Sequence, residues 1–225
     1  MMELKYSEII KKNTELGKSF KSKPYKITVI SNIITHPIKE ILEYQLRTRK
    51  INTKVEFGDY DNIVQDSLKN SESNAVIIFW ELCNILDGLQ YEIELFDKKK
   101  ISQIIKKTKK EIDFVIQSLE KTSLILINKF TSIPFSNFNI KTNNFDELAI
   151  KLNEHLFGKV SSNVAIIDVN KVIATNGVPK SINNRDYYSS KSLYTVDYFK
   201  AYTEYVIPYF ISANGKAKKI LILDC

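Results

Sequence analysis

A serine, an asparagine, a threonine and a histidine follow closely after the first apolar run of the chain. They are Ser31, Asn32, Thr35 and His36, and the run before them is 27–30. A serine hydroxyl activated by an imidazole, with an amide that donates to the developing oxyanion, is the equipment of acyl transfer. If the chain is an active enzyme, we expect Ser31 to attack and His36 to assist, with Asn32 and Thr35 as binding residues.

Polar residues also follow later apolar runs. Gly58 and Asp59 follow the second run, Glu81 and Asn84 follow the third, and Asp168 ends the fifth. In an open parallel sheet, ligands bind outside the carboxyl ends of the strands. We therefore expect these residues to share one site, with Asp168 as a second candidate for the assisting base and the other four as binding residues.

The chain closes with a short apolar run that presents an aspartate. The run Ile220–Leu223 precedes Asp224, and its β-branched and leucine residues are typical of a buried parallel strand. We expect the chain to be the front portion of a longer protein, with this strand belonging to the next domain. Asp224 should be inert here, because phosphoryl transfer also needs magnesium, a second carboxylate and a phosphate cradle.

Five apolar runs alternate with helical tracts, and this alternation predicts the architecture. The runs are 27–31, 54–57, 75–80, 124–127 and 164–168. Each is too apolar to be half exposed, which indicates parallel strands covered by helices on both faces. We predict a three-layer α/β/α sandwich with a flavodoxin-like parallel sheet of about five strands, plus a C-terminal strand from a following domain.

Three segments are expected along the chain: a leading helix in 1–22, the α/β domain in 23–213 and the start of a further domain in 214–225. Inside the middle segment, the sequence predicts one long helical tract at about 92–120 and a loop at 177–192. Thr195 is expected to cap an aromatic helix after that loop.

The segment Val29–Thr35 resembles the first block of SGNH hydrolases, which places a Gly-Asp-Ser turn after strand one. On this resemblance Ser31 falls at the glycine, Asn32 at the aspartate and Ile33 at the nucleophile. Gly58 fits the glycine of the family's second block. An isoleucine cannot attack an ester, so the resemblance implies the SGNH fold with a damaged first block.

The family's later blocks are incomplete as well. Asn84 matches the asparagine of the third block, but Ser192–Asp197 holds no histidine where the family has Asp-x-x-His before its last helix. The remaining histidine, His155, is expected to lie at the surface or to cap a helix. Since removing triad members costs several orders of magnitude in rate, we expect a catalytically silent module.

The order of elements resembles the N-terminal half of FkbH-like proteins, in which an SGNH-like domain precedes a haloacid dehalogenase (HAD) domain. The residues that carry this resemblance are Ser31-Asn32 with Thr35, Gly58–Tyr60 with Val64-Gln65, and Lys219–Cys225. The resemblance implies that the chain is truncated at the first HAD aspartate. Asp224 would be the HAD nucleophile of the full-length protein, and Mg²⁺ the cofactor of its HAD domain.

Similar full-length proteins load a three-carbon glyceryl unit from a phosphoglycerate onto an acyl carrier protein, or act in polysaccharide and polyketide assembly. We therefore expect a non-catalytic SGNH-like binding or docking module of an FkbH-like HAD phosphatase or glyceryl transferase. Its expected partners are an acyl carrier protein and the protein's own HAD domain. The alternative is an active SGNH-type esterase or acyl transferase that uses Ser31.

Composition excludes several classes of partner. The net charge is +7, but of 33 basic residues only Arg47, Arg49 and Arg185 are arginines, whereas nucleic-acid binding relies on arginine forks as well as lysines. The lysines of 98–110 alternate with isoleucines, as on the solvated face of an amphipathic helix. No apolar run approaches about 18 residues, and the two cysteines suggest neither disulfides nor a metal site. We expect a cytoplasmic protein that binds neither nucleic acid nor membrane, with no metal or cofactor in this segment.

Overall fold

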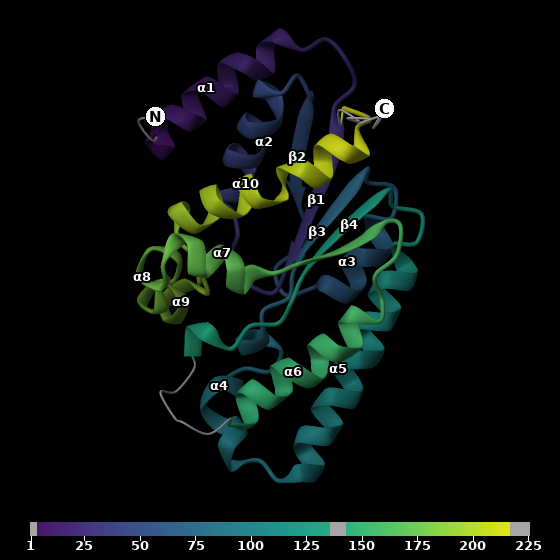
Figure 1. Ribbon diagram of the computed structural model, residues 1–225, viewed down its shortest axis with the longest axis vertical. Helices are drawn as coiled ribbons and strands as arrows, with labels where there is room; N and C mark the ends of the chain where they lie inside the picture. Colours follow the sequence, from purple (N-terminus) through teal and green to yellow (C-terminus); the bar gives the residue numbers. More distant parts are fainter. Residues whose placement is uncertain (1–3, 136–142, 217–225) are drawn as a thin grey trace, which may run out of the picture.

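The computed structural model describes residues 4–135 and 143–216, which are built around one parallel sheet. The sheet has five strands in the order β2-β1-β3-β4-β5 (Figure 1). The strands are β1 Tyr25–Ser31, β2 Thr53–Phe57, β3 Ala75–Phe79, β4 Leu124–Asn128 and β5 Val164–Ile167. Two of the three interior strands, β3 and β4, are buried along their whole length, as their apolar runs predict.

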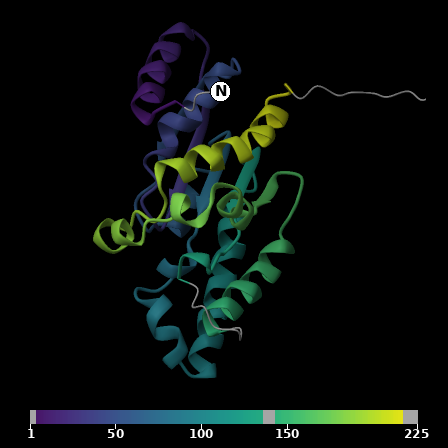
Figure 2. The same ribbon diagram turned by 60° about the vertical axis from the view of Figure 1, so that its left-hand side comes forward.

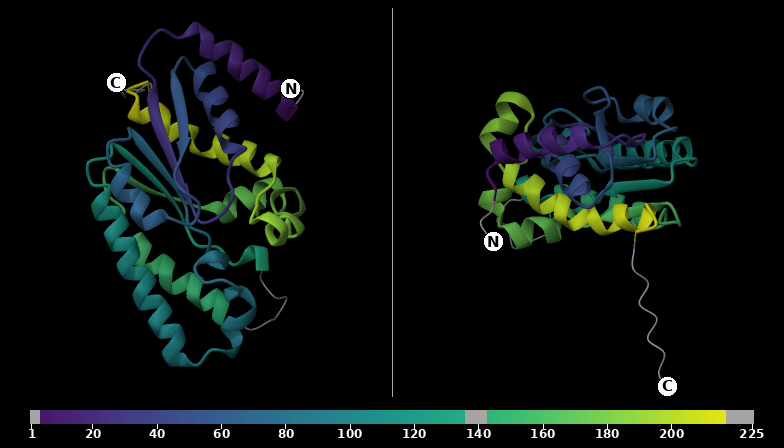
Figure 3. Two further views of the ribbon diagram at one scale, coloured as in Figure 1. Left: turned by 180° about the vertical axis from the view of Figure 1, so that it is seen from behind. Right: turned by 90° about the horizontal axis from the view of Figure 1, so that it is seen from above.

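Helices cover both faces of the sheet. They are α1 Tyr6–Ser19, α2 Ile38–Thr48, α3 Ile63–Lys69, α4 Leu89–Glu92, α5 Lys98–Ser118, α6 Asn144–Phe157, α7 Val169–Asn176, α8 Val178–Ser181, α9 Asn184–Ser190 and α10 Val196–Ala213. Helices α2, α7 and α10 pack together on one face, and α3, α5 and α6 on the other. Helix α10 crosses in front of the sheet in Figure 1 and behind it in the reversed view of Figure 3. The predicted three-layer α/β/α sandwich is confirmed.

The strand order reverses between β1 and β3. From β1 the chain moves outward to β2, and it then returns to form β3 on the other side of β1. The loops that leave the carboxyl ends of β1 and β3 therefore diverge. In doubly wound sheets this divergence opens the crevice in which ligands bind.

A polar network attaches the leading helix to the domain. Helix α1 lies along the outer side of α2 (Figure 2). Its Asn13 donates to Glu43 at 2.9 Å and accepts from Arg47 at 2.7 Å, and Glu43 pairs with Arg47 at 3.2 Å. Glu43 also accepts the Val55 N–H, and Arg47 donates to the Thr53 carbonyl, so the network joins α1, α2 and β2.

The predicted aromatic helix closes the core on the α10 face. The Thr195 hydroxyl accepts the Tyr198 N–H at 3.1 Å and caps α10, as its position before the helix predicts. Phe79 of β3 contacts this helix, with ring centroids 4.9 Å from Tyr202 and 6.0 Å from Phe199. These large rings bury the end of β3 beside the sheet crevice.

Two segments differ from the prediction. The tract 92–120 is interrupted: a 3-10 turn at Ile93–Leu95 precedes Asp97, whose side chain caps α5 by accepting the Lys100 N–H at 2.7 Å. The predicted loop 177–192 contains α8 and α9 instead, because Asn183 caps α9. The expected C-terminal strand and Asp224 lie outside the described residues, as does most of the expected segment 214–225.

Candidate functional site

The crevice between β1 and β3 is closed by Asn32 and Glu81. The Asn32 amide donates to the Glu81 carbonyl at 2.9 Å, and the Glu81 N–H donates to the Asn32 side-chain oxygen at 2.7 Å. The Asn32 N–H also donates to the Phe79 carbonyl at 3.1 Å. Asn32 is only 1% exposed, so its amide continues the pairing of the two strands beyond their ends.

The loops after β1, β2 and β3 are joined around this pair. The Asn84 amide donates to the Asn32 carbonyl and, at 3.3 Å, to the Tyr60 hydroxyl. The Asp61 N–H donates to the Ser31 carbonyl at 3.1 Å. Four residues expected to share a site, Ser31, Asn32, Glu81 and Asn84, are thus brought together, although mostly through main-chain groups.

Ser31 is held in a local turn. Its hydroxyl donates to the Ile33 carbonyl at 2.7 Å. The His36 ring is exposed and lies edge-on to Phe57, with centroids 5.1 Å apart, and no hydrogen bond in the described part of the chain joins Ser31 to a histidine. Ile33 is 1% exposed, and Thr35 is also buried. Within the described ranges, the Ser31 hydroxyl therefore donates to a main-chain carbonyl and not to a side-chain base.

Asp168 lies at the far side of the sheet from Ser31. Strands β3 and β4 separate β5 from β1, which places the two strand ends roughly 14 Å apart at three strand spacings. Asp168 pairs with Lys129 at 2.6 Å and caps α7 by accepting the Asn170 N–H. His155 pairs with Asp113 at 2.8 Å at the surface, so neither residue reaches the crevice.

Gly58 is needed for a close approach. A Cβ at this position would overlap a carboxylate oxygen of Asp66 and lie 3.0 Å from Ile30. The buried Asp66 accepts the Asp59 N–H, while the exposed Asp59 carboxylate pairs with Lys69 at 3.0 Å. The Gly58 N–H donates to Val29 at 2.9 Å, so it is not free to stabilise an oxyanion.

The Glu81 carboxyl is buried under tyrosines. It is 2% exposed, and one of its oxygens has no hydrogen-bond partner in the described part of the chain. Burial raises the pKa of Glu81 to about 7, and the neighbouring Tyr194 hydroxyl offsets part of this rise. Tyr194 stacks on Tyr198 at 3.8 Å, and the Tyr202 hydroxyl donates to Asn128 at 2.8 Å.

The sequence did not indicate that Tyr194 is one of the residues that bury Glu81. Tyr198 and Tyr202 are four residues apart and share one face of α10. Tyr194 precedes the Thr195 cap and forms a bridge with Ile182, so no helical spacing indicates it. The nearby Cys83 is also buried. Burial and the Glu81 carboxylate raise its pKa to about 12, so its thiol is not an activated nucleophile.

A pocket of about 280 Å³ opens beside the closed crevice. It is lined by Asp61, Ile63, Val64, Gln65, Trp80, Asn84, Ile85, Lys107 and Glu111. Of the predicted site residues only Asn84 lines it. No sequence pattern indicated Asp61, whose backbone is left-handed with φ of 54°. The sequence also did not indicate Lys107 and Glu111 of α5, which line the pocket because α3 packs on α5.

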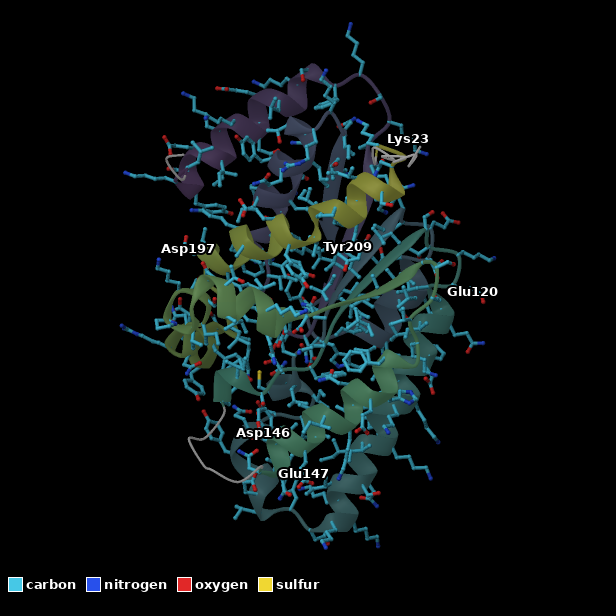
Figure 4. All side chains as sticks on the ribbon, in the orientation of Figure 1. Lys23, Glu120, Asp146, Glu147, Asp197 and Tyr209 are labelled. Atoms are coloured by element: carbon cyan, nitrogen blue, oxygen red, sulfur yellow. The ribbon has the colours of Figure 1, made fainter. Side chains whose placement is uncertain are left out.

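A larger hollow of about 590 Å³ lies at the opposite ends of the strands. Lys23 and Lys26 line it, and Figure 4 shows Lys23 at the far end of α10 from Asp197. It is remote from the strand reversal, so the smaller pocket is the candidate ligand site. Across the described residues, no cluster of three or more His, Cys, Asp or Glu side chains could hold a metal ion, and no helix has the length and apolarity to cross a membrane.

The comparisons with known proteins identify the fold. No protein-family model and no curated protein sequence matches the chain. The N-terminal part of protein BF1531 from Bacteroides fragilis, described as containing a phosphatase domain and complexed with Mg, is similar with a TM-score of 0.75 and 13% identity. The match covers 96% of this chain and 59% of that structure, so the chain spans about three fifths of its length.

Two further structures share the fold. The lipase Lip_vut3 from a goat rumen metagenome is 12% identical with a TM-score of 0.58, over 82% of this chain and 96% of the lipase. The salicylyl-acyltransferase SsfX3 from a tetracycline biosynthetic pathway is 13% identical with a TM-score of 0.52, over 87% of this chain and 56% of the transferase. At these identities the comparisons show a shared fold, an α/β sandwich of the flavodoxin/SGNH-like type.

Proposed function

We propose that this domain is a catalytically silent SGNH-like module that binds or docks for an associated HAD-type phosphatase or glyceryl transferase. The observation that carries the proposal is that the candidate nucleophile and the candidate oxyanion donors are already hydrogen-bonded within the fold. The Ser31 hydroxyl, the Asn32 amide and the Gly58 N–H each donate to a main-chain carbonyl. An acyl-transfer site instead keeps its nucleophile beside a base and its donors directed at the oxyanion.

An esterase assay tests the proposal that the domain lacks catalytic activity. The purified chain should not turn over short acyl esters or acetylated sugars above the uncatalysed rate. The matched variants are Ser31→Ala and Ser102→Ala, the second of which changes an exposed serine on α5. Turnover that disappears in Ser31→Ala and persists in Ser102→Ala would establish the alternative, an active esterase or acyl transferase.

An acyl carrier protein is the partner we propose for the lysine-rich face of α5. Lys106 and Lys110 are exposed on this helix and form no ion pair with other described residues. Acyl carrier proteins are acidic helical bundles, and complementary charge mainly raises the rate of association. The net charge of +7 favours the same encounter.

Charge reversal tests the partner. Lys106→Glu with Lys110→Glu should slow association with a carrier protein at least tenfold at low salt, and the difference should shrink at high salt. The control reverses Lys11 and Lys12, which are exposed on α1. Binding that is insensitive to salt, or equally weakened by both pairs of substitutions, would contradict docking on α5.

We propose a catalytic role for Asp224 in a longer polypeptide. In a following HAD domain it would be the phosphorylated nucleophile, with Mg²⁺ supplied by that domain. The 225-residue chain alone should stay unmodified when incubated with acetyl phosphate and Mg²⁺. Mass spectrometry that finds an acyl phosphate at Asp224 would contradict this expectation.

A further inference from the structure

We infer that the pocket beside Trp80 binds a neutral polyhydroxylated ligand the size of one sugar ring. The inference rests on the proposed function as a binding module and names a ligand class for it. The pocket lies at the carboxyl ends of the strands, next to the reversal between β1 and β3, where open sheets bind ligands. Its lining does not include Ser31 or Asn32.

Three side chains of the pocket lining, two of them exposed, have polar atoms without a hydrogen-bond partner among the described residues. In the described part of the chain, neither the Asp61 carboxylate nor the Gln65 amide makes a hydrogen bond, and no donor reaches the Asn84 side-chain oxygen. These groups offer both donors and acceptors around one small space. A ligand with several hydroxyl groups, each of which donates and accepts, matches such a set.

The apolar part of the lining complements a sugar ring. Trp80 is 6% exposed and Ile63 is similarly buried, and both contribute to the pocket lining. The C–H groups of a sugar are apolar and can pack on an indole while the hydroxyls face the polar groups. The volume of about 280 Å³ equals about nine water molecules at roughly 30 Å³ each, which suits one ring but not a long chain.

The charges around the pocket disfavour an anion. Asp61 and Glu111 are acidic, and Lys107 is the one basic residue in the lining, paired with Glu111 at 3.6 Å. Partial burial raises the pKa of Asp61, and Lys191 lowers it in part. A phosphate or carboxylate ligand would meet a net negative lining, whereas a neutral polyol avoids this repulsion.

Fluorescence of Trp80 provides a direct measurement, because the chain has a single tryptophan. The probes are glucose, N-acetylglucosamine and glucose 6-phosphate, each titrated into the full chain. At least one neutral sugar should give a saturable change, and glucose 6-phosphate should bind more weakly than glucose. Gln65→Leu should weaken the neutral sugar about tenfold by removing its hydrogen bonds. Gln117→Leu, the same change at an exposed position on α5, should have no effect.

Several results would overturn the inference. The first is that neither glucose nor N-acetylglucosamine gives a saturable change. The second is that Gln65→Leu and wild type bind the neutral sugar equally well. The third is that glucose 6-phosphate binds more tightly than glucose. N-acetylglucosamine that carries an O-acetyl ester separates this inference from the proposal of a catalytically silent module.

If the ester is hydrolysed and its binding depends on Gln65, the silent-module proposal is refuted and the sugar site is retained. If the compound is neither bound nor hydrolysed, only the sugar site is refuted.

Discussion

Replacing Glu81 by glutamine should stabilise the protein in a pH-dependent way. Glu81 is buried under Tyr194, Tyr198 and Tyr202, and none of these neighbours carries a positive charge to balance an ionised carboxyl. Burial raises the pKa of Glu81 from the usual 4.5 to about 7. A glutamine side chain would keep the shape and the main-chain bonds to Asn32 but could not ionise.

The direction of the pH effect on stability follows from how many protons the folded and unfolded states bind. Between about pH 4.5 and pH 7 the folded protein holds the Glu81 proton while the unfolded chain releases it, so the stability of the wild type falls as pH rises through this window. Below the window both states are protonated, and above it the loss is complete. At 1.36 kcal/mol for each pKa unit, the difference between the two pKa values corresponds to about 3 kcal/mol.

Denaturation by urea at several pH values measures the effect. From pH 5 to pH 8, the stability of Glu81→Gln relative to wild type should rise by about 2 to 3 kcal/mol, or roughly 5 to 10 °C in Tm. Other ionisable groups are common to both proteins and cancel in the difference. Glu154→Gln, at an exposed position on α6, is the control and should show no such rise. A Glu81→Gln difference that stays constant from pH 5 to pH 8 would refute the reasoning.

Three further substitutions test contacts that shape the domain, each by urea denaturation. Gly58→Ala should cost about 1 to 3 kcal/mol, because the added methyl group would overlap the Asp66 carboxylate. Glu43→Ala should cost about 3 to 5 kcal/mol, since it leaves the largely buried Arg47 guanidinium without its carboxylate. Asn32→Asp should cost about 1 to 3 kcal/mol by removing a buried donor, and it should not create esterase activity. A change below about 0.5 kcal/mol in any of them would contradict the corresponding contact.

The strands could be predicted because their signal is local. Runs such as 75–79 and 124–128 are apolar at nearly every position, and that pattern alone indicates a strand with both faces covered. The boundary of α5 was harder to predict. It depends on a short turn ending at Leu95 and on the Asp97 cap, which a continuous helical pattern in the lysine-rich tract conceals.

The clustering of some candidate residues could be predicted, because parallel strands bring their carboxyl ends to one edge whatever the details of the loops. That rule placed Ser31, Asn32, Glu81 and Asn84 near one another. It could not indicate which of their atoms are already bonded. The Asn32 amide binds Glu81, which is 49 residues away along the chain, and no local pattern reports such a contact.

The proposal of binding without catalysis depends on a contrast between side chains that already have hydrogen-bond partners and side chains that have none. At the crevice, the side chains of Ser31 and Asn32 complete main-chain hydrogen bonds, so drawing either into a reaction would leave buried carbonyls unpaired, at a cost of about 1 to 3 kcal/mol each. At the neighbouring pocket, Asp61 and Gln65 can meet a ligand without breaking any protein hydrogen bond of their side chains. On the proposed function, a ligand should therefore enter beside Trp80 while the crevice stays closed.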